Sequence, residues 1–111
     1  MYTTSSVFPW LLVAASVAAE VAGTVGLRYA DGFTRLLPSL AVVLLYGLAI
    51  WLMSLAVRRL EVGLTYALWA GCGTALTALV GILFFNESAN LLRLLGFTFI
   101  VIGVATLNLG S

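Results

Sequence analysis

Four long apolar stretches constrain the fold of this chain more than any other feature. They cover about residues 7–29, 38–58, 63–85 and 91–109, and a helix of this length, at ~1.5 Å per residue, crosses ~30 Å of hydrocarbon. Their apolar residues are continuous rather than periodic, which indicates membrane spans instead of amphipathic helices. The sequence therefore predicts an all-α membrane protein in which residues 1–111 form a single domain of four transmembrane helices.

The composition excludes several other classes of protein. Of the 111 residues, 63% are hydrophobic and 8% are charged, whereas about a quarter of the residues of a typical soluble domain are charged. The sequence contains no His and one cysteine, Cys72, so it lacks the parts of a disulfide, a zinc site or an acid–base catalyst. We expect no cofactor and no enzymatic activity, and a net charge of +1 indicates no nucleic-acid partner.

The arginines in the short connections bear on how the chain inserts into the membrane. The first and third loops, which share one side of the membrane, hold Arg28, Arg35 and Arg93, and the second loop holds Arg58 and Arg59. This near balance gives almost no bias under the positive-inside rule. We therefore expect insertion in both orientations, with a single orientation set by other features as the alternative.

Four helices also enclose too little volume for a polar pathway. Many transporters are built from two inverted halves, related by an axis in the membrane plane. A chain of 111 residues is too short to contain a second half of this kind, and an antiparallel copy would supply it. The predicted assembly is an antiparallel, dual-topology homodimer.

One carboxylate lies inside the first apolar stretch. No Lys or Arg stands near Glu20 between about Val7 and Leu27, and charged residues within spans tend to line ion or substrate pathways because they are costly to bury. Residues three, four or seven positions away share its helical face, which is small and mildly polar. They are Val13, Ser16, Val17, Gly23, Thr24 and Leu27. The alternative is a protonated, purely structural Glu20.

Aromatic residues supply a second part of the predicted site. Tyr66, Trp69 and Gly73 fall on one face of the third stretch, and Tyr46 and Trp10 lie in the second and first stretches. Aromatic faces attract cations, most strongly where water is excluded. A carboxylate beside these rings suits a hydrophobic cation, although Trp10 is also placed to be an interfacial anchor.

Glycines in the last two stretches predict close packing or bending. Gly71 and Gly73 lie in the middle of the third stretch, where glycine weakens a helix and permits a bend. Gly96 and Gly103 are seven residues apart in the fourth stretch and form one small-residue seam. Such seams let transmembrane helices approach closely.

These features together resemble the small multidrug resistance family of proton-coupled exporters, and in particular its EmrE-type members. The similarity extends over nearly the whole chain. The stretches that carry it are Ala19-Glu20-Val21, Gly32-Phe33-Thr34-Arg35-Leu36 through Pro38-Ser39, Tyr66-Ala67-Leu68-Trp69 with Gly71 and Gly73, and Leu107-Asn108-Leu109.

The resemblance implies a role for each part of the pattern. Glu20 would bind the proton and the substrate in turn, Gly71 and Gly73 would form a kink, and Gly96 and Gly103 would mediate dimerisation. The expected activity is proton-coupled export of lipophilic, quaternary-ammonium and aromatic cations across a bacterial plasma membrane. The predicted substrate-binding residues are Trp69, Tyr66, Tyr46, Trp10, Ser16, Val17 and Thr24.

Two other functions remain open. The family also contains guanidinium exporters, which usually have a tryptophan three residues after the glutamate and a lysine near the end of the last helix. Here these positions hold Gly23 and Asn108, and Tyr46 matches the multidrug subtype. Glu61, which replaces a common proline, and the segment 87–90, which is closer to the guanidinium subtype, depart from that pattern. From a different class, a non-transporting structural or assembly subunit would also bury Glu20.

Overall fold

The computed structural model describes residues 4–110, with side chains from residue 7 onward. These residues form four helices and no strand: α1 (Thr4–Ala30), α2 (Leu36–Ala56), α3 (Val62–Phe84) and α4 (Leu91–Leu109). Each helix is long and apolar enough to cross a membrane, over Val7–Ala30, Leu36–Ala56, Val62–Phe84 and Leu91–Leu109. The predicted all-helical, multi-pass membrane architecture is confirmed.

Helix α2 begins at Leu36, ahead of the predicted start near residue 38. Pro38 therefore lies inside the first turn of the helix rather than before it. Proline is tolerated there because the first N–H groups of a helix have no intrahelical acceptor. At its other end, α2 stops at Ala56, ahead of the predicted end near residue 58. The basic pair Arg58 and Arg59 therefore lies in the turn after the helix.

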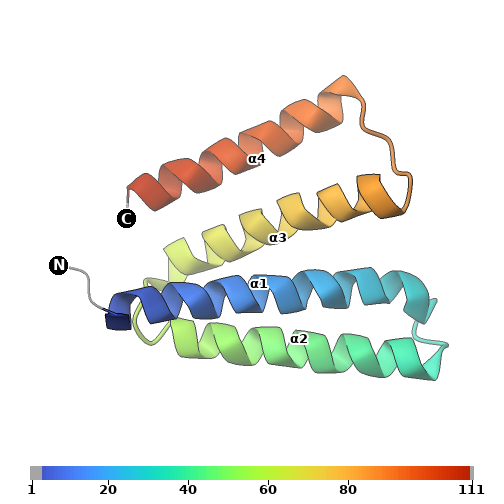
Figure 1. Ribbon diagram of the computed structural model, residues 1–111, viewed down its shortest axis with the longest axis horizontal. Coiled ribbons are helices and arrows are strands. Elements are labelled where there is room, and N and C mark those ends of the chain that lie inside the picture. Colours follow the sequence, from blue (N-terminus) through green and yellow to red (C-terminus); the bar gives the residue numbers. More distant parts are fainter. Residues whose placement is uncertain (1–3, 111) are drawn as a thin grey trace.

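The turn between α1 and α2 uses three consecutive left-handed residues. Asp31, Gly32 and Phe33 have φ values of 50°, 68° and 64°, a region that aspartate tolerates better than most residues and that Phe rarely adopts. The Thr34 amide donates to the Ala30 carbonyl at 3.0 Å and closes the turn. This tight turn sets α1 and α2 side by side as an antiparallel pair (Figure 1).

Small residues make the contact between α1 and α2 close. Ser16 is fully buried and donates its hydroxyl to the Ala49 carbonyl at 2.7 Å. Ala49 is buried at this contact. Ala56 is buried in the adjoining apolar cluster, which includes Val17. Helices in a membrane associate through such close packing and interhelical hydrogen bonds rather than through a hydrophobic driving force.

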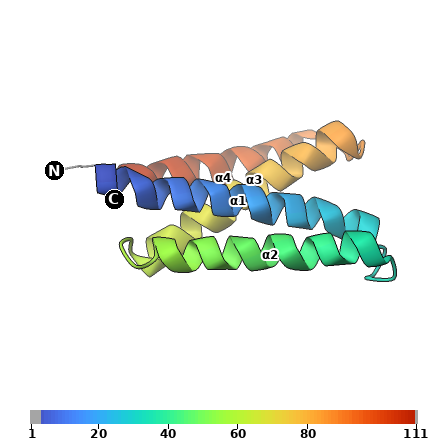
Figure 2. The same cartoon turned by 60° about the horizontal axis from the view of Figure 1, so that its bottom comes forward.

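The four helices form an open row in the order α2, α1, α3, α4 (Figure 1). The extents of the chain are 47 × 36 × 19 Å, so the row is about two helix diameters thick. Figure 2 shows the same arrangement from a tilted view, with α2 and α4 on opposite sides of α1 and α3. One chain therefore does not surround a pathway.

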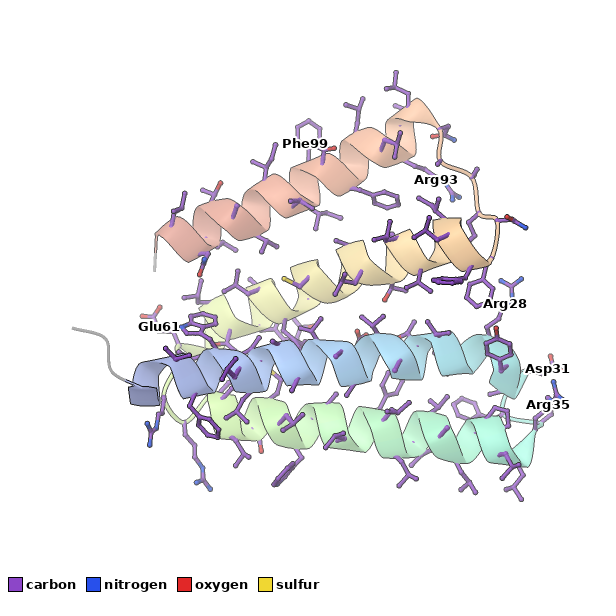
Figure 3. All side chains as sticks on the ribbon, viewed as in Figure 1. Arg28, Asp31, Arg35, Glu61, Arg93 and Phe99 are labelled. Atoms are coloured by element: carbon purple, nitrogen blue, oxygen red, sulfur yellow. The ribbon has the colours of Figure 1, made fainter. Side chains whose placement is uncertain are left out.

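Helix α4 is the least covered helix. Its main contact is with α3, where Gly71 lies against Val104, and none of its described residues is buried. Phe99 is 70% exposed and points away from the other helices (Figure 3). Most of the α4 surface is thus available to lipid or to another chain.

Candidate functional site

The Glu20 carboxylate lies at the interface of α1 and α3 and is half-buried. The hydroxyl of Thr24, one turn further along α1, donates to Glu20 Oε1 at 3.2 Å. Thr24 Oγ1 is also 2.7 Å from Tyr46 Oη on α2. A hydroxyl carries a single proton, so when Thr24 donates to Glu20, Tyr46 is the donor to Thr24. A hydrogen-bonded chain therefore runs from α2 to the carboxylate.

Gly73 makes room for the other carboxylate oxygen. A Cβ atom at Gly73 would lie 2.9 Å from Glu20 Oε2, closer than such atoms are found in proteins. Glycine at this position of α3 thus lets the carboxylate rest against the helix backbone. Helix α3 is continuous through Gly71 and Gly73, and the kink predicted for this pair stays a prediction.

A cavity of about 510 Å³ opens beside Glu20 between α1 and α3. The Tyr66 and Trp69 rings stand together on its wall, with centroids 5.7 Å apart and planes tilted by 47°. Its lining residues are Glu20, Thr24, Tyr66, Trp69, Ala70, Gly73, Thr74, Thr77, Ala78 and Glu87. The structure therefore brings together Glu20 and Thr24 on α1 with the Tyr66–Trp69 pair on α3.

The indole N–H of Trp69 is buried and has no hydrogen-bond partner among the described side chains and backbone. A buried donor without an acceptor costs free energy. A bound ligand or a second chain that offers an acceptor would recover it. In the single chain, the Trp69 side chain therefore lacks the hydrogen-bond acceptor that its N–H needs.

Tyr46 contributes to the site without lining the cavity. Its ring packs on Gly23, where a Cβ atom would lie 2.8 Å from both Cδ1 and Cε1 of the ring. A larger residue at position 23 would displace the Tyr46 ring, and with it the hydroxyl that reaches Thr24. The position of the Tyr46 ring thus requires a glycine at position 23.

Three predicted substrate-binding residues lie away from Glu20 in the single chain. Ser16 is buried against α2, and its hydroxyl is occupied by the Ala49 carbonyl. Trp10 and Val17 line a separate, mainly apolar cavity of about 470 Å³ between α1, α3 and α4. A role for these residues in substrate binding stays a prediction.

The glycine seam of α4 is open. A Cβ atom at Gly96 or Gly103 would meet no described atom within 4 Å. By contrast, a Cβ atom at Gly71 would collide with the Val104 side chain, so Gly71 is the glycine that determines how closely α3 and α4 approach. The dimerisation role of Gly96 and Gly103 stays a prediction.

Sequence reasoning missed Glu87 as a site residue. This loop carboxylate lines both the Glu20 cavity and an adjoining cavity of about 370 Å³ that also contains Arg28. The Arg28 guanidinium lies over the Phe85 ring, 4.9 Å from its centroid. Figure 3 shows Arg28 at the same end of the helices as Asp31 and Arg93, with Glu61 at the opposite end. The acidic loop residue was visible in the sequence, but no spacing rule connects it to Glu20.

A sequence profile described as Small Multidrug Resistance protein matches residues 8–100. The chain belongs to this family. Members with similar sequences include the quaternary ammonium compound-resistance protein QacF of Klebsiella aerogenes, 43% identical over 92% of this chain and 93% of that protein. The multidrug resistance protein EbrA of Bacillus licheniformis is 42% identical over 90% of this chain and 93% of its own length.

A guanidinium exporter of Proteus vulgaris is 39% identical over 92% of this chain and 98% of its own length. The resemblance drawn from the sequence motifs is confirmed at the level of the family. These relatives are named as resistance proteins and an exporter rather than as enzymes. The two subtypes considered from the sequence are thus both represented among the relatives.

Proposed function

We propose that the chain exports lipophilic, quaternary-ammonium and aromatic cations in exchange for protons. The observation that carries this proposal is the membrane-embedded Glu20 carboxylate, which opens onto a cavity walled by Tyr66 and Trp69. The carboxylate offers charge and the rings offer cation–π and stacking surface. The name of QacF, which refers to quaternary ammonium compounds, supports a cationic cargo, and the name of EbrA, which refers to multidrug resistance, supports more than one substrate.

The coupling follows from the cost of an uncompensated charge in the membrane. An ionised Glu20 without a partner is unfavourable there, so the side chain is most stable with either a proton or a cation. Binding of a cation then releases the proton, and binding of a proton releases the cation. The hydrogen bond from Thr24, supported by Tyr46, holds one carboxylate oxygen in place while the occupant changes.

The proposed transporting unit is an antiparallel homodimer in a bacterial plasma membrane. The open row of helices, the uncovered α4 surface and the near-balanced arginines support this assembly. Two Glu20 carboxylates would then share one pathway. Because the two chains are identical, inward-open and outward-open forms can be the same structure with the roles of the chains exchanged.

A guanidinium exporter is the second candidate. The similarity to the Proteus vulgaris exporter favours it. The sequence of the loop at 87–90, which is closer to that of the guanidinium subtype, favours it too. The packing of Tyr46 on Gly23 favours the multidrug subtype, because the space that a tryptophan at position 23 would need is occupied by the Tyr46 ring.

Proton release from purified protein in detergent tests the proposal. Addition of tetraphenylphosphonium to weakly buffered native protein should release protons in amounts that saturate with the cation, whereas guanidinium should release far fewer. A larger response to guanidinium would favour the second candidate. No proton release with either cation would indicate a structural subunit and contradict the export function.

A further inference from the structure

A groove continues from the Glu20 cavity to the loop between α3 and α4. The cavity beside Glu20 and the adjoining cavity share three lining residues, Thr24, Thr77 and Glu87. Helices α1 and α3 run in the same direction (Figure 1), and each presents residues four positions apart, which share one helical face. They are Glu20, Thr24 and Arg28 on α1, and Gly73, Thr77 and Gly81 on α3.

Each end of this groove holds a carboxylate that rests on a glycine. Glu20 lies against Gly73, and Glu87 lies so close to Gly81 that a Cβ atom there would collide with its carboxylate. The two glycines are eight residues apart on α3, which corresponds to about 12 Å along the helix axis. The two carboxylates thus rest on glycines about two turns apart on α3, and this spacing suits two successive positions on one path.

Hydrogen bonds hold the backbone of the loop that carries Glu87. Asn86 adopts a left-handed conformation with φ 54°, which asparagine tolerates better than most residues. The chain thereby turns back, and the Glu87 amide donates to the Gly81 carbonyl at 3.1 Å. Asn90 caps α4 through the Arg93 amide, and the Arg93 guanidinium donates to the Ser88 carbonyl at 3.1 Å. The backbone on both sides of Glu87 is therefore held.

Arg28 gives the outer cavity a positive charge that opposes an incoming cation. Its guanidinium lies over the Phe85 ring, on the same cavity wall as Glu87. A carboxylate at the same mouth offsets this repulsion and attracts a cation. Glu87 could thus act on the cation or could only neutralise Arg28, and the experiment has to separate these roles.

We propose that Glu87 is an outer station of the cation path: it attracts the cation at the mouth of the groove before the cation reaches Glu20. The inference rests on the proposed export function, and it specifies where the cation enters the path to Glu20. Electrostatic steering of this kind acts mainly on the association rate and weakens as salt screens the charge.

The test is stopped-flow binding of tetraphenylphosphonium to the detergent-solubilised full chain. Glu87→Gln should slow association roughly three- to tenfold at low salt and less than about twofold in 1 M NaCl, where the Debye length is ~3 Å. Glu87→Asp, which keeps the charge, should stay within about twofold of the native rate.

Glu61→Gln is the matched control, because it removes the same charge at a loop residue that lines neither the Glu20 cavity nor the adjoining one. Glu61 makes no side-chain capping hydrogen bond to α3, so the substitution removes no cap from that helix. It should leave the association rate unchanged. Equal slowing by Glu61→Gln would attribute the effect to net charge and overturn the proposal.

Two further outcomes are decisive. In an Arg28→Gln background, further slowing by Glu87→Gln supports the proposal, whereas equal rates in Arg28→Gln and Arg28→Gln/Glu87→Gln would mean that Glu87 only neutralises Arg28, which overturns it. An unchanged rate in Glu87→Gln at low salt also overturns it while leaving the export function standing. Failure of the native chain to bind the cation at all would instead contradict the export function itself, and the inference with it.

Discussion

At the scale of single residues, glycines leave the space that two side chains of the site occupy. Gly73 leaves the space in which the Glu20 carboxylate rests, and Gly23 leaves the space for the Tyr46 ring that supports Thr24. Neither position needs an unusual backbone conformation, since both lie inside regular helices. What these positions require is the absence of a side chain.

Gly73→Ala should therefore weaken cation binding without unfolding the chain. The new methyl group would push Glu20 Oε2 away from α3, and crowding of a packed site typically costs about 1–3 kcal/mol. We expect the Kd for tetraphenylphosphonium, measured by calorimetry, to rise roughly tenfold. Gly47→Ala is the matched control, because a Cβ atom at Gly47 meets nothing within 4 Å. Unchanged affinity in Gly73→Ala would remove Gly73 from the site.

Trp69→Ala should weaken the binding of aromatic cations more than it changes proton release through Glu20. Cation–π attraction is worth ~0.5–2 kcal/mol, which corresponds to roughly two- to thirty-fold in affinity. Ring contact acts on the organic cation alone, whereas the proton binds only the carboxylate. The measurement is binding of tetraphenylphosphonium across a range of pH in both proteins. If its affinity is the same in native and mutant protein, Trp69 does not contact the substrate.

At the scale of helices, the contact between α3 and α4 depends on one pair of residues. Gly71 is so close to Val104 that any side chain at position 71 must displace the valine. Since α3 is the helix that α4 chiefly contacts, this contact is the main constraint on the position of α4. Apolar side chains of α3 and α4 line two further cavities beside this contact.

Gly71→Ala should lower the stability of the helix pair, and Val104→Ala should restore it in the double variant. We expect a loss of roughly 1 kcal/mol, or about 4–8 °C in Tm, for Gly71→Ala. A double-mutant cycle on thermal unfolding in detergent measures the coupling between the two positions. Additive effects would show that the two residues do not control the approach of α3 and α4.

The helices were predictable from the sequence because hydrophobic length alone defines a membrane span. Helical spacing, which is a local property, predicted that Glu20 shares a face with Thr24 and Tyr66 a face with Trp69. That these two faces meet is a contact between α1 and α3, which spacing within one helix does not give. Ser16 shares that spacing yet faces α2, because α1 is covered by two neighbouring helices and its polar face is divided between them. Glu87 was not predictable, since its place at the groove depends on the left-handed turn at Asn86.

At the scale of the whole molecule, an open row of four helices needs a partner to enclose a pathway. The near balance of arginines predicts that about half of the chains insert in each orientation. Ser88→Cys in a Cys72→Ser background places one thiol in the α3–α4 loop. A membrane-impermeant maleimide applied to intact cells should label about half of these chains. Complete labelling, or none, would contradict dual topology.

Proton-driven uptake of tetraphenylphosphonium into proteoliposomes tests the central claim most directly, because Glu20 is the group in which proton and cation compete. The native protein should accumulate the cation when a pH gradient is imposed, and Glu20→Gln, which keeps the shape but removes the titratable charge, should lose this accumulation while remaining a folded dimer. Size-exclusion chromatography and helical circular dichroism check the fold of the variant. Continued proton-driven accumulation by Glu20→Gln would contradict the account, since coupling would then reside elsewhere in the chain.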